Sequence, residues 1–151
     1  MIQKIISTCK KITILIMSFF YIGIGLKHFS DPSFFLKIMP PYLPWHLELI
    51  YLSGFFEIIL GGLLLIHKYR FYAGWGLIIL LVLVFPANVY VYTFPEILST
   101  TQDKALIRMF FQIPLIIIAY WHSIENERKW LSYLALLMFF PTIFYFINLS
   151  I

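Results

Sequence analysis

Five apolar runs dominate the sequence, and each is long enough to cross a lipid bilayer, which takes about 20 largely apolar residues as a helix. Short polar stretches separate the runs, and no length is left for a separate soluble domain. The sequence therefore predicts an all-α membrane protein in which residues 1–151 form a single membrane domain. The runs cover residues 12–29, 47–66, 72–94, 106–122 and 130–151.

The composition of the chain also indicates that lipid surrounds most of it. Hydrophobic residues make up 62% of the chain and charged residues 12%, against roughly 45–50% and 25% in soluble domains, so the lipid bilayer is the expected partner. The charges gather at the ends of apolar runs rather than in a stripe that could follow phosphates, so nucleic acid is not an expected partner. Cys9 is the only cysteine, which argues against an internal disulfide or a dithiol redox pair.

The distribution of Lys and Arg predicts the orientation of the spans. Seven of them lie in the amino terminus and in the loops after the second and fourth runs, and four lie on the opposite side. Because cytoplasmic loops are richer in Lys and Arg, we expect a multi-pass protein of the cell membrane with a cytoplasmic amino terminus. The first run lacks a small-residue cleavage site, so we interpret it as an uncleaved helix. The seven are Lys4, Lys10, Lys11, Lys68, Arg70, Arg128 and Lys129.

Glu57 is the most unusual residue of the apolar runs, because an ionisable side chain in hydrocarbon is costly unless it faces protein, water or a partner. It lies about ten residues into the second run, about 14 Å from the end of that run at a rise of about 1.5 Å per residue. Ser53, Gly54 and Gly61 share its helical face, and small residues allow close helix packing. We therefore expect Glu57 to face the inside of the bundle.

The other runs also carry polar faces by helical spacing. In the fourth run Arg108 lies near the outer end and Gln112 about 6 Å deeper. Asn88 of the third run follows Pro86, which tends to kink a membrane helix. The polar or small face of the first run consists of Ser18, Tyr21, Gly25 and His28.

These residues predict a polar cluster in the outer half of the bundle. The most specific prediction about this cluster is that Glu57 pairs with Arg108, directly or through Gln112. The alternative is that the groups only satisfy one another as interhelical bonds of about 0.6 to 2 kcal/mol each. No spacing matches a metal-ligand set, and no residue is assigned a catalytic role. The candidate ligand-binding or buried polar residues are His28, Asp31, Glu57, Asn88, Arg108 and Gln112.

The loop from residue 30 to 46 is only half polar. Asp31 followed by Pro32 is typical of a helix N-cap and first position, and Pro40-Pro41 ends any helix that follows. We expect a short helix whose apolar side caps the mouth of the bundle or lies among lipid headgroups. A proline-rich connector is the alternative. The apolar side comprises Phe34, Phe35, Ile38 and Met39.

Several short motifs occur together between residues 12 and 122. They are Gly-Ile-Gly-Leu-Lys-His-Phe at 23–29, Asp31-Pro32, Lys-Ile-Met-Pro-Pro-Tyr-Leu-Pro at 37–44, Ser-Gly-Phe-Phe-Glu at 53–57, Ala-Gly-Trp-Gly at 73–76 and Val-Phe-Pro-Ala-Asn at 84–88. This combination resembles the DoxX-like family of integral membrane proteins, and Arg108 and Gln112 resemble its Arg-x-x-x-Gln element. The resemblance implies a four-helix transmembrane bundle, so residues 130–151 would be an additional C-terminal transmembrane helix.

Three functions fit these features. In the first, suggested by relatives that are membrane subunits associated with thiosulfate–quinone oxidoreduction, the outer-half cluster binds a quinone or another small hydrophobic ligand beside a redox-protein partner. This rests on analogy at the level of the family. In the second, the chain is a small transporter or permease, with homo-oligomers compensating for its short length. In the third, it is a scaffold whose polar cluster is structural.

Overall fold

The computed structural model describes residues 2–125 and 128–148. Within these ranges the chain is all-helical, without a β-strand, and five helical stretches are long and apolar enough to cross a membrane, as the sequence predicted. In chain order the elements are α1 (Ile2–Ser30), α2 (Pro32–Ile38), α3 (His46–Leu65), η1 (His67–Tyr69), α4 (Arg70–Thr93), η2 (Pro95–Leu98), α5 (Gln102–Phe110), α6 (Gln112–Ser123) and α7 (Lys129–Asn148).

The first helix is longer than predicted, since α1 begins at Ile2 rather than at residue 12. The lysines of this segment do not end the helix, because one face of it still packs on the protein. Ile6 and Lys10 are buried on that face, and Lys10 Nζ donates to the backbone oxygen of Ile124 at 2.8 Å. A long lysine side chain can bury its methylenes in this way while its ammonium finds a polar partner.

The fourth predicted span is two helices rather than one. α5 ends at Phe110, α6 begins at Gln112, and Phe111 lies in the turn between them. Pro114 explains the break, because proline lacks an N–H and its ring clashes with the carbonyl of the residue four positions earlier, here Phe110. In its observed place Pro114 lies in the first turn of α6, where a missing N–H costs nothing. The two helices together still form one stretch of membrane length, Gln102–Ser123.

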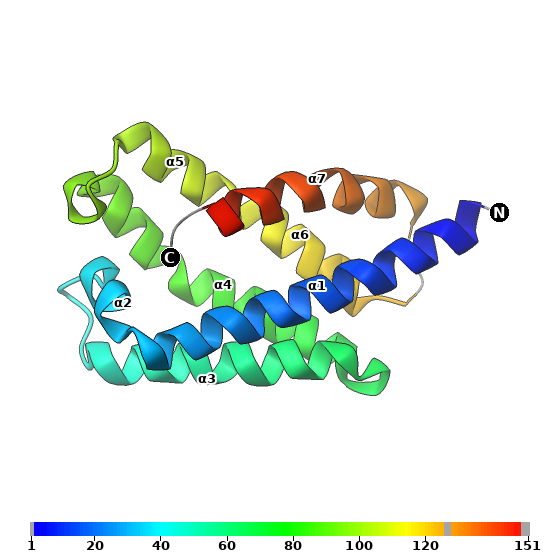
Figure 1. Cartoon of the computed structure of the whole chain (residues 1–151), viewed down its shortest axis with the longest axis horizontal. Helices are drawn as coiled ribbons and strands as arrows, with labels where there is room; N and C mark the ends of the chain where they lie inside the picture. The colour runs from blue at the N-terminus through cyan, green and yellow to red at the C-terminus, as the bar shows by residue number, and fades with distance from the viewer. Residues whose placement is uncertain (1, 126–127, 149–151) are drawn as a thin grey trace.

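α1 and α3 form the most extensive helix pair of the described residues, and they run side by side in Figure 1. A Cβ atom added to Gly25 would lie 2.6 Å from Gly54 O, and one added to Gly61 would lie 3.0 Å from Ser18 O. The Ser18 hydroxyl also donates to Gly61 O. The small-residue face predicted around Glu57 is therefore the surface on which α1 packs.

The other helices close around this pair. α4 packs against α6, where a Cβ atom added to Gly74 would lie 2.7 Å from Ala119 O. α7 lies along α6 and meets α1 through an edge-on contact of Phe20 with Phe146, whose ring centroids are 5.9 Å apart. Residues 149–151 of the predicted fifth span lie outside the described residues.

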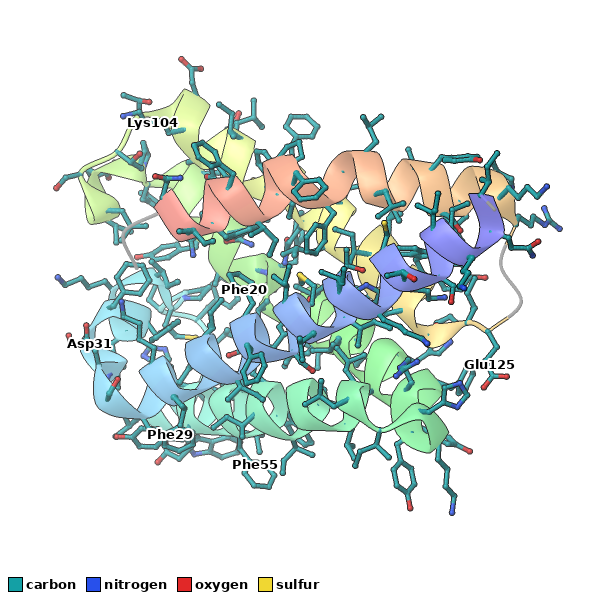
Figure 2. The ribbon with its side chains drawn as sticks, turned by 45° about the vertical axis from the view of Figure 1, so that its right-hand side comes forward. Phe20, Phe29, Asp31, Phe55, Lys104 and Glu125 are labelled. Carbon is teal, nitrogen blue, oxygen red and sulfur yellow. The ribbon has the colours of Figure 1, made fainter. Side chains whose placement is uncertain are left out.

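Large apolar side chains cover much of the outer surface. Phe29 and Phe55, both pointing outward in Figure 2, are 46% and 51% exposed, and Leu137 is 74% exposed. Polar side chains such as Ser18 and Gln112 are meanwhile buried inside. This distribution, apolar outside with polar groups within, is compatible with a multi-pass membrane protein.

Candidate functional site

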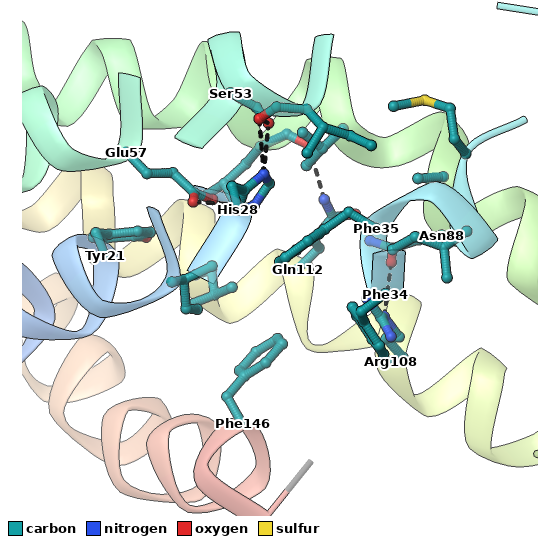
Figure 3. A pocket seen from close by; sticks show the side chains of 18 of the residues that line it. Tyr21, His28, Phe34, Phe35, Ser53, Glu57, Asn88, Arg108, Gln112 and Phe146 are labelled. Atoms are coloured by element: carbon teal, nitrogen blue, oxygen red, sulfur yellow. Dashed lines mark hydrogen bonds and ion pairs between the residues drawn. The ribbon is translucent and has the colours of Figure 1, made fainter. Parts of the chain in front are cut away.

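A cavity of about 160 Å³ lies where α1, α2, α3, α4, α5, α6 and α7 approach one another. We refer to it as the outer pocket, after the half of the bundle in which the sequence predicted a polar cluster. Figure 3 shows Glu57 beside Tyr21 and His28, with Asn88 and Arg108 on another side of the pocket. The predicted site residues that line it are His28, Glu57, Asn88, Arg108 and Gln112, together with Tyr21 and Ser53 and an apolar wall that includes Phe20, Ile24, Phe34, Phe35, Leu115 and Phe146.

His28 and Glu57 form the central polar contact, with 3.3 Å between His28 Nε2 and Glu57 Oε2. The close packing of α1 on α3 brings them together: His28 lies three residues after Gly25, and Glu57 lies three residues after Gly54. Both side chains are largely buried, with 7% and 14% of their surface exposed. Glu57 therefore faces the inside of the bundle, as predicted.

The neighbours of the His28 ring indicate which of its nitrogens carries a hydrogen. His28 Nδ1 lies 2.9 Å from Ile50 O and 3.1 Å from Ser53 Oγ. Because a carbonyl oxygen can only accept, Nδ1 carries a hydrogen and donates it. A neutral ring would then present a lone pair at Nε2, which would repel a carboxylate. A proton on either Nε2 or the Glu57 carboxyl turns this repulsion into attraction.

Arg108 pairs with Asn88 rather than with Glu57, so the predicted Glu57–Arg108 pair is wrong. Arg108 Nε donates to Asn88 Oδ1 at 3.0 Å. Gln112 does not bridge them either, since its Nε2 donates to Leu81 O at 2.8 Å. Two local causes separate the charges: Pro114 places Arg108 on α5, next to α4, while the glycine contacts give Glu57 a partner on α1.

Asp31 does not line the outer pocket, contrary to the prediction. It is exposed at the left edge of Figure 2, at the N-cap position of α2, where its side chain makes no capping bond. Instead, Ser33 Oγ donates to Asp31 Oδ1 at 2.5 Å, and this bond holds the pKa of Asp31 below its usual value. The residue belongs to the surface because α1 has already ended at Ser30.

The short helix predicted after Asp31 is confirmed as α2, with Pro32 in its first turn. Phe35 and Ile38 are buried, and they line the outer pocket with Phe34 and Met39. Phe35 also stacks on the His28 ring, with centroids 3.6 Å apart. The apolar side of α2 therefore caps this end of the bundle.

Tyr21 was absent from the predicted site although its spacing placed it on the same face as His28. It is 4% exposed, and its hydroxyl has no hydrogen-bond partner in the part of the chain that the structure describes. Gln112 Oε1 is equally buried and equally without a partner there. Glu57 Oε2, although 3.3 Å from His28 Nε2, is a third buried atom without a hydrogen-bond partner in the described ranges. Buried polar groups are usually bonded, so three such atoms in one cavity indicate a place where a ligand can bind.

The comparison with known families identifies residues 17–123 as a match to a domain of unknown function (DUF8561). The chain belongs to this family, whose match begins within α1, extends to the end of α6 and leaves out α7. It includes the residues of the outer pocket except Phe146. No curated protein matches the chain. No solved structure matches it either.

Proposed function

We propose that the chain is a multi-pass membrane protein whose outer pocket binds the ring of a small amphipathic molecule, with a quinone as the leading candidate. One observation carries the proposal: Tyr21 Oη and Gln112 Oε1, both buried, lack protein partners in the described ranges and line the same largely apolar cavity. A donor and an acceptor in such a cavity suit a ligand that is apolar over most of its surface and polar at a few atoms.

The size of the cavity favours a single ring. It measures about 160 Å³, and an apolar protein cavity of about 150 Å³ is known to take up a benzene molecule. Phe35 and Phe146 supply aromatic surface from α2 and α7, and aromatic rings stack or pack edge-on at little cost. A longer apolar tail would have to leave the pocket toward lipid.

The polar groups suit both oxidation states of a quinone. Tyr21 can donate a hydrogen bond to a quinone carbonyl, and Gln112 Oε1 can accept one from a quinol hydroxyl. Interconversion of the two states moves two electrons and two protons. A redox-protein partner would exchange the electrons, and both protons would come from or go to the medium, one of them by way of the Glu57–His28 contact. This is the role that the resemblance to DoxX-like proteins also suggests, and the DoxX-like relationship itself stays a prediction.

The proposed arrangement in the membrane is a four-helix bundle of α1, α3, α4 and α5–α6 with α7 as an additional span. The amino terminus is cytoplasmic in this proposal, by the distribution of Lys and Arg. The outer pocket then lies toward the outer face. Transport would need a path from there to the opposite end through the core that separates the two ends, in which Ile14, Met17 and Ile118 are buried. Ligand binding needs no such path.

The first test measures binding of a short-chain benzoquinone to the purified chain and to Glu57→Gln. The variant keeps the size of the side chain but removes the acid group, and we expect about tenfold weaker binding, the usual effect of losing a hydrogen bond to a charged group. Glu48→Gln is the matched control, because Glu48 is an exposed residue of the same helix. Equal affinity in all three proteins would reject the role of Glu57.

Tyr21→Phe separates ligand binding from a structural role. It removes only a hydroxyl that has no partner in the described ranges, so the melting temperature should be unchanged or higher while affinity for the quinone falls about fivefold. Tyr120→Phe, at a 41% exposed position, is the control.

If no variant changes affinity while Glu57→Gln and Arg108→Ala only lower the melting temperature, the polar cluster is a scaffold. Quinone-independent solute uptake by proteoliposomes, abolished in Glu57→Gln, would instead indicate a transporter.

A further inference from the structure

A second cavity, of about 440 Å³, lies at the end of the molecule opposite the outer pocket. Here the beginning of α1, the turn between α3 and α4, and the segment after α6 come together, at the right of Figure 1. We refer to this cavity as the basic pocket. Its polar lining consists of Ser7, Lys10, Lys11, His67, Lys68, Arg70, His122, Ser123 and Glu125.

The lining of the basic pocket is strongly positive. Among its residues, all within the described ranges, four are Lys or Arg and one is a carboxylate, Glu125. Glu125 offsets little of this positive charge, because its side chain is 76% exposed and water screens it. Its Oε1 lies 3.7 Å from Nε2 of His67, which is exposed as well. Charges of one sign around a concave surface focus the potential there. The cavity therefore favours an anion.

Arg70 is held in place by the protein while most of its donors stay available. Its Nε donates to Leu64 O at 3.0 Å, which satisfies a carbonyl near the end of α3. The described part of the chain shows no other hydrogen bond of this guanidinium. Its two terminal NH₂ groups can thus act as the planar fork that binds phosphate oxygens in pairs.

The lysines divide into two kinds. Lys10 is buried and engaged, since it donates to Ile124 O and lies 5.3 Å from the centroid of the Trp121 ring; it contributes positive charge to the inner wall. Lys11 and Lys68 are exposed at the rim. Their ammonium groups can therefore contact a ligand that enters the pocket from outside. Such an arrangement suits a headgroup that enters from the surface.

We propose that the basic pocket binds the phosphate group of an anionic phospholipid. The choice of a lipid rests on the proposed membrane location, in which this pocket lies where the ends of the spans meet the cytoplasmic leaflet. That leaflet is rich in anionic lipids, and basic pockets between membrane helices bind their headgroups. The phosphate lies against Arg70 with Lys11 and Lys68 above it, and its acyl chains run along the apolar outside of the bundle.

The test titrates the full-length chain in a nonionic detergent with phosphatidylglycerol, phosphatidylcholine or inorganic phosphate, with native mass spectrometry as the readout. The test variant is Lys11→Gln with Lys68→Gln. The matched control is Lys37→Gln with Lys104→Gln, which removes two exposed charges from the other end of the molecule. We expect the test variant to bind phosphatidylglycerol about tenfold more weakly, because each lysine near an anionic headgroup adds to the affinity. The control should match the wild type.

Each other outcome overturns the proposal in a distinct way. Equal affinity for phosphatidylglycerol and phosphatidylcholine would show that the anionic charge is not recognised. Equal losses in the test and control variants would show that only net charge matters. Binding of inorganic phosphate as tight as that of the lipid, with the same dependence on Lys11 and Lys68, would assign the pocket to a soluble phosphate compound. None of these results bears on quinone binding in the outer pocket, which the same samples can report separately.

Discussion

The two ends of the bundle each bury a histidine, and the surroundings of the two rings are opposite. His28 Nε2 faces a carboxyl oxygen of Glu57, whereas His122 Nε2 lies 3.1 Å from the hydroxyl of Thr13 in a pocket that also contains Lys10. The first setting places an acid beside a base, and the second already contains fixed positive charge. The comparison teaches that the chemistry of a buried histidine in this fold is set by the helix that packs against it.

The largest expected effect is on stability, and it should differ between the two histidines. His28→Leu leaves the Glu57 carboxyl buried without its partner, which should lower the free energy of unfolding by about 3 kcal/mol. His122→Leu loses a neutral hydrogen bond and should cost about 1 kcal/mol. Unfolding of both variants in detergent, followed by circular dichroism, measures the difference.

A double variant sharpens this result. His28→Leu combined with Glu57→Leu removes both members of the pair, so it should be more stable than His28→Leu alone. Equal losses for His28→Leu and His122→Leu, or no recovery in the double variant, would mean that the His28–Glu57 contact does not distinguish the stability of the two ends.

The second effect concerns the glycines that bring the helices together at each end. A Cβ atom at Gly54 would lie 2.5 Å from His28 Cβ, and one at Gly74 would lie 2.5 Å from Ser123 Cβ. Each change to Ala should cost about 1 to 3 kcal/mol by overpacking. Gly54→Ala should also weaken quinone binding and Gly74→Ala lipid binding. Gly23→Ala is the control, because a Cβ atom there meets nothing within 4 Å; a comparable loss in that variant would contradict the packing argument.

Much of the fold follows from sequence pattern, and the errors have local causes. The spacing of Ser18, Tyr21, Gly25 and His28 correctly identified the inner face of α1, and the small residues around Glu57 identified the helix face that it meets. The sequence pattern did not predict the break at Phe111, because the run remains apolar on both sides of Pro114. That one break helps to explain why Arg108 reaches Asn88 instead of Glu57.

The residues that meet in the candidate site are harder to predict from sequence than the side of each helix that faces inward. His28, Glu57, Asn88, Arg108 and Gln112 meet in one pocket, because each lies on an inward face that spacing reveals. Which of these residues pair with one another depends on the distances between helices. The spacing of residues along the sequence gives no information about those distances. Asp31 was included for its charge and its closeness to His28 in the sequence, yet the end of α1 at Ser30 leaves it on the surface.

A third prediction concerns ligand affinity at one end only. Arg108 lines the outer pocket while its Nε is bonded to Asn88, so Arg108→Gln should weaken quinone binding about fivefold by removing charged donors and leave lipid binding unchanged. Lys104→Gln, one turn earlier on α5 and exposed, is the control for charge. A change in phosphatidylglycerol affinity in Arg108→Gln would show that the two ends are coupled.

The smallest effect is expected at Asp31, outside both pockets. Its pKa is lowered from an ordinary value of 3.8, chiefly by the hydrogen bond from Ser33. A carboxyl with a lowered folded-state pKa adds stability above its unfolded pKa and loses it as the pH falls through the folded value. Ser33→Ala should therefore slightly flatten the decline of melting temperature below about pH 4, with no change in quinone affinity. An effect on affinity would place Asp31 in the site after all.

The central claim is that the two ends are separate sites of different chemistry, and one crossed binding measurement tests it most directly. Wild type, Glu57→Gln and the Lys11→Gln, Lys68→Gln double variant are each titrated with a short-chain benzoquinone and with phosphatidylglycerol. We predict that Glu57→Gln loses affinity only for the quinone and that the lysine variant loses affinity only for the lipid, each by about tenfold. If either variant loses both ligands, or neither variant loses its own, the claim is contradicted.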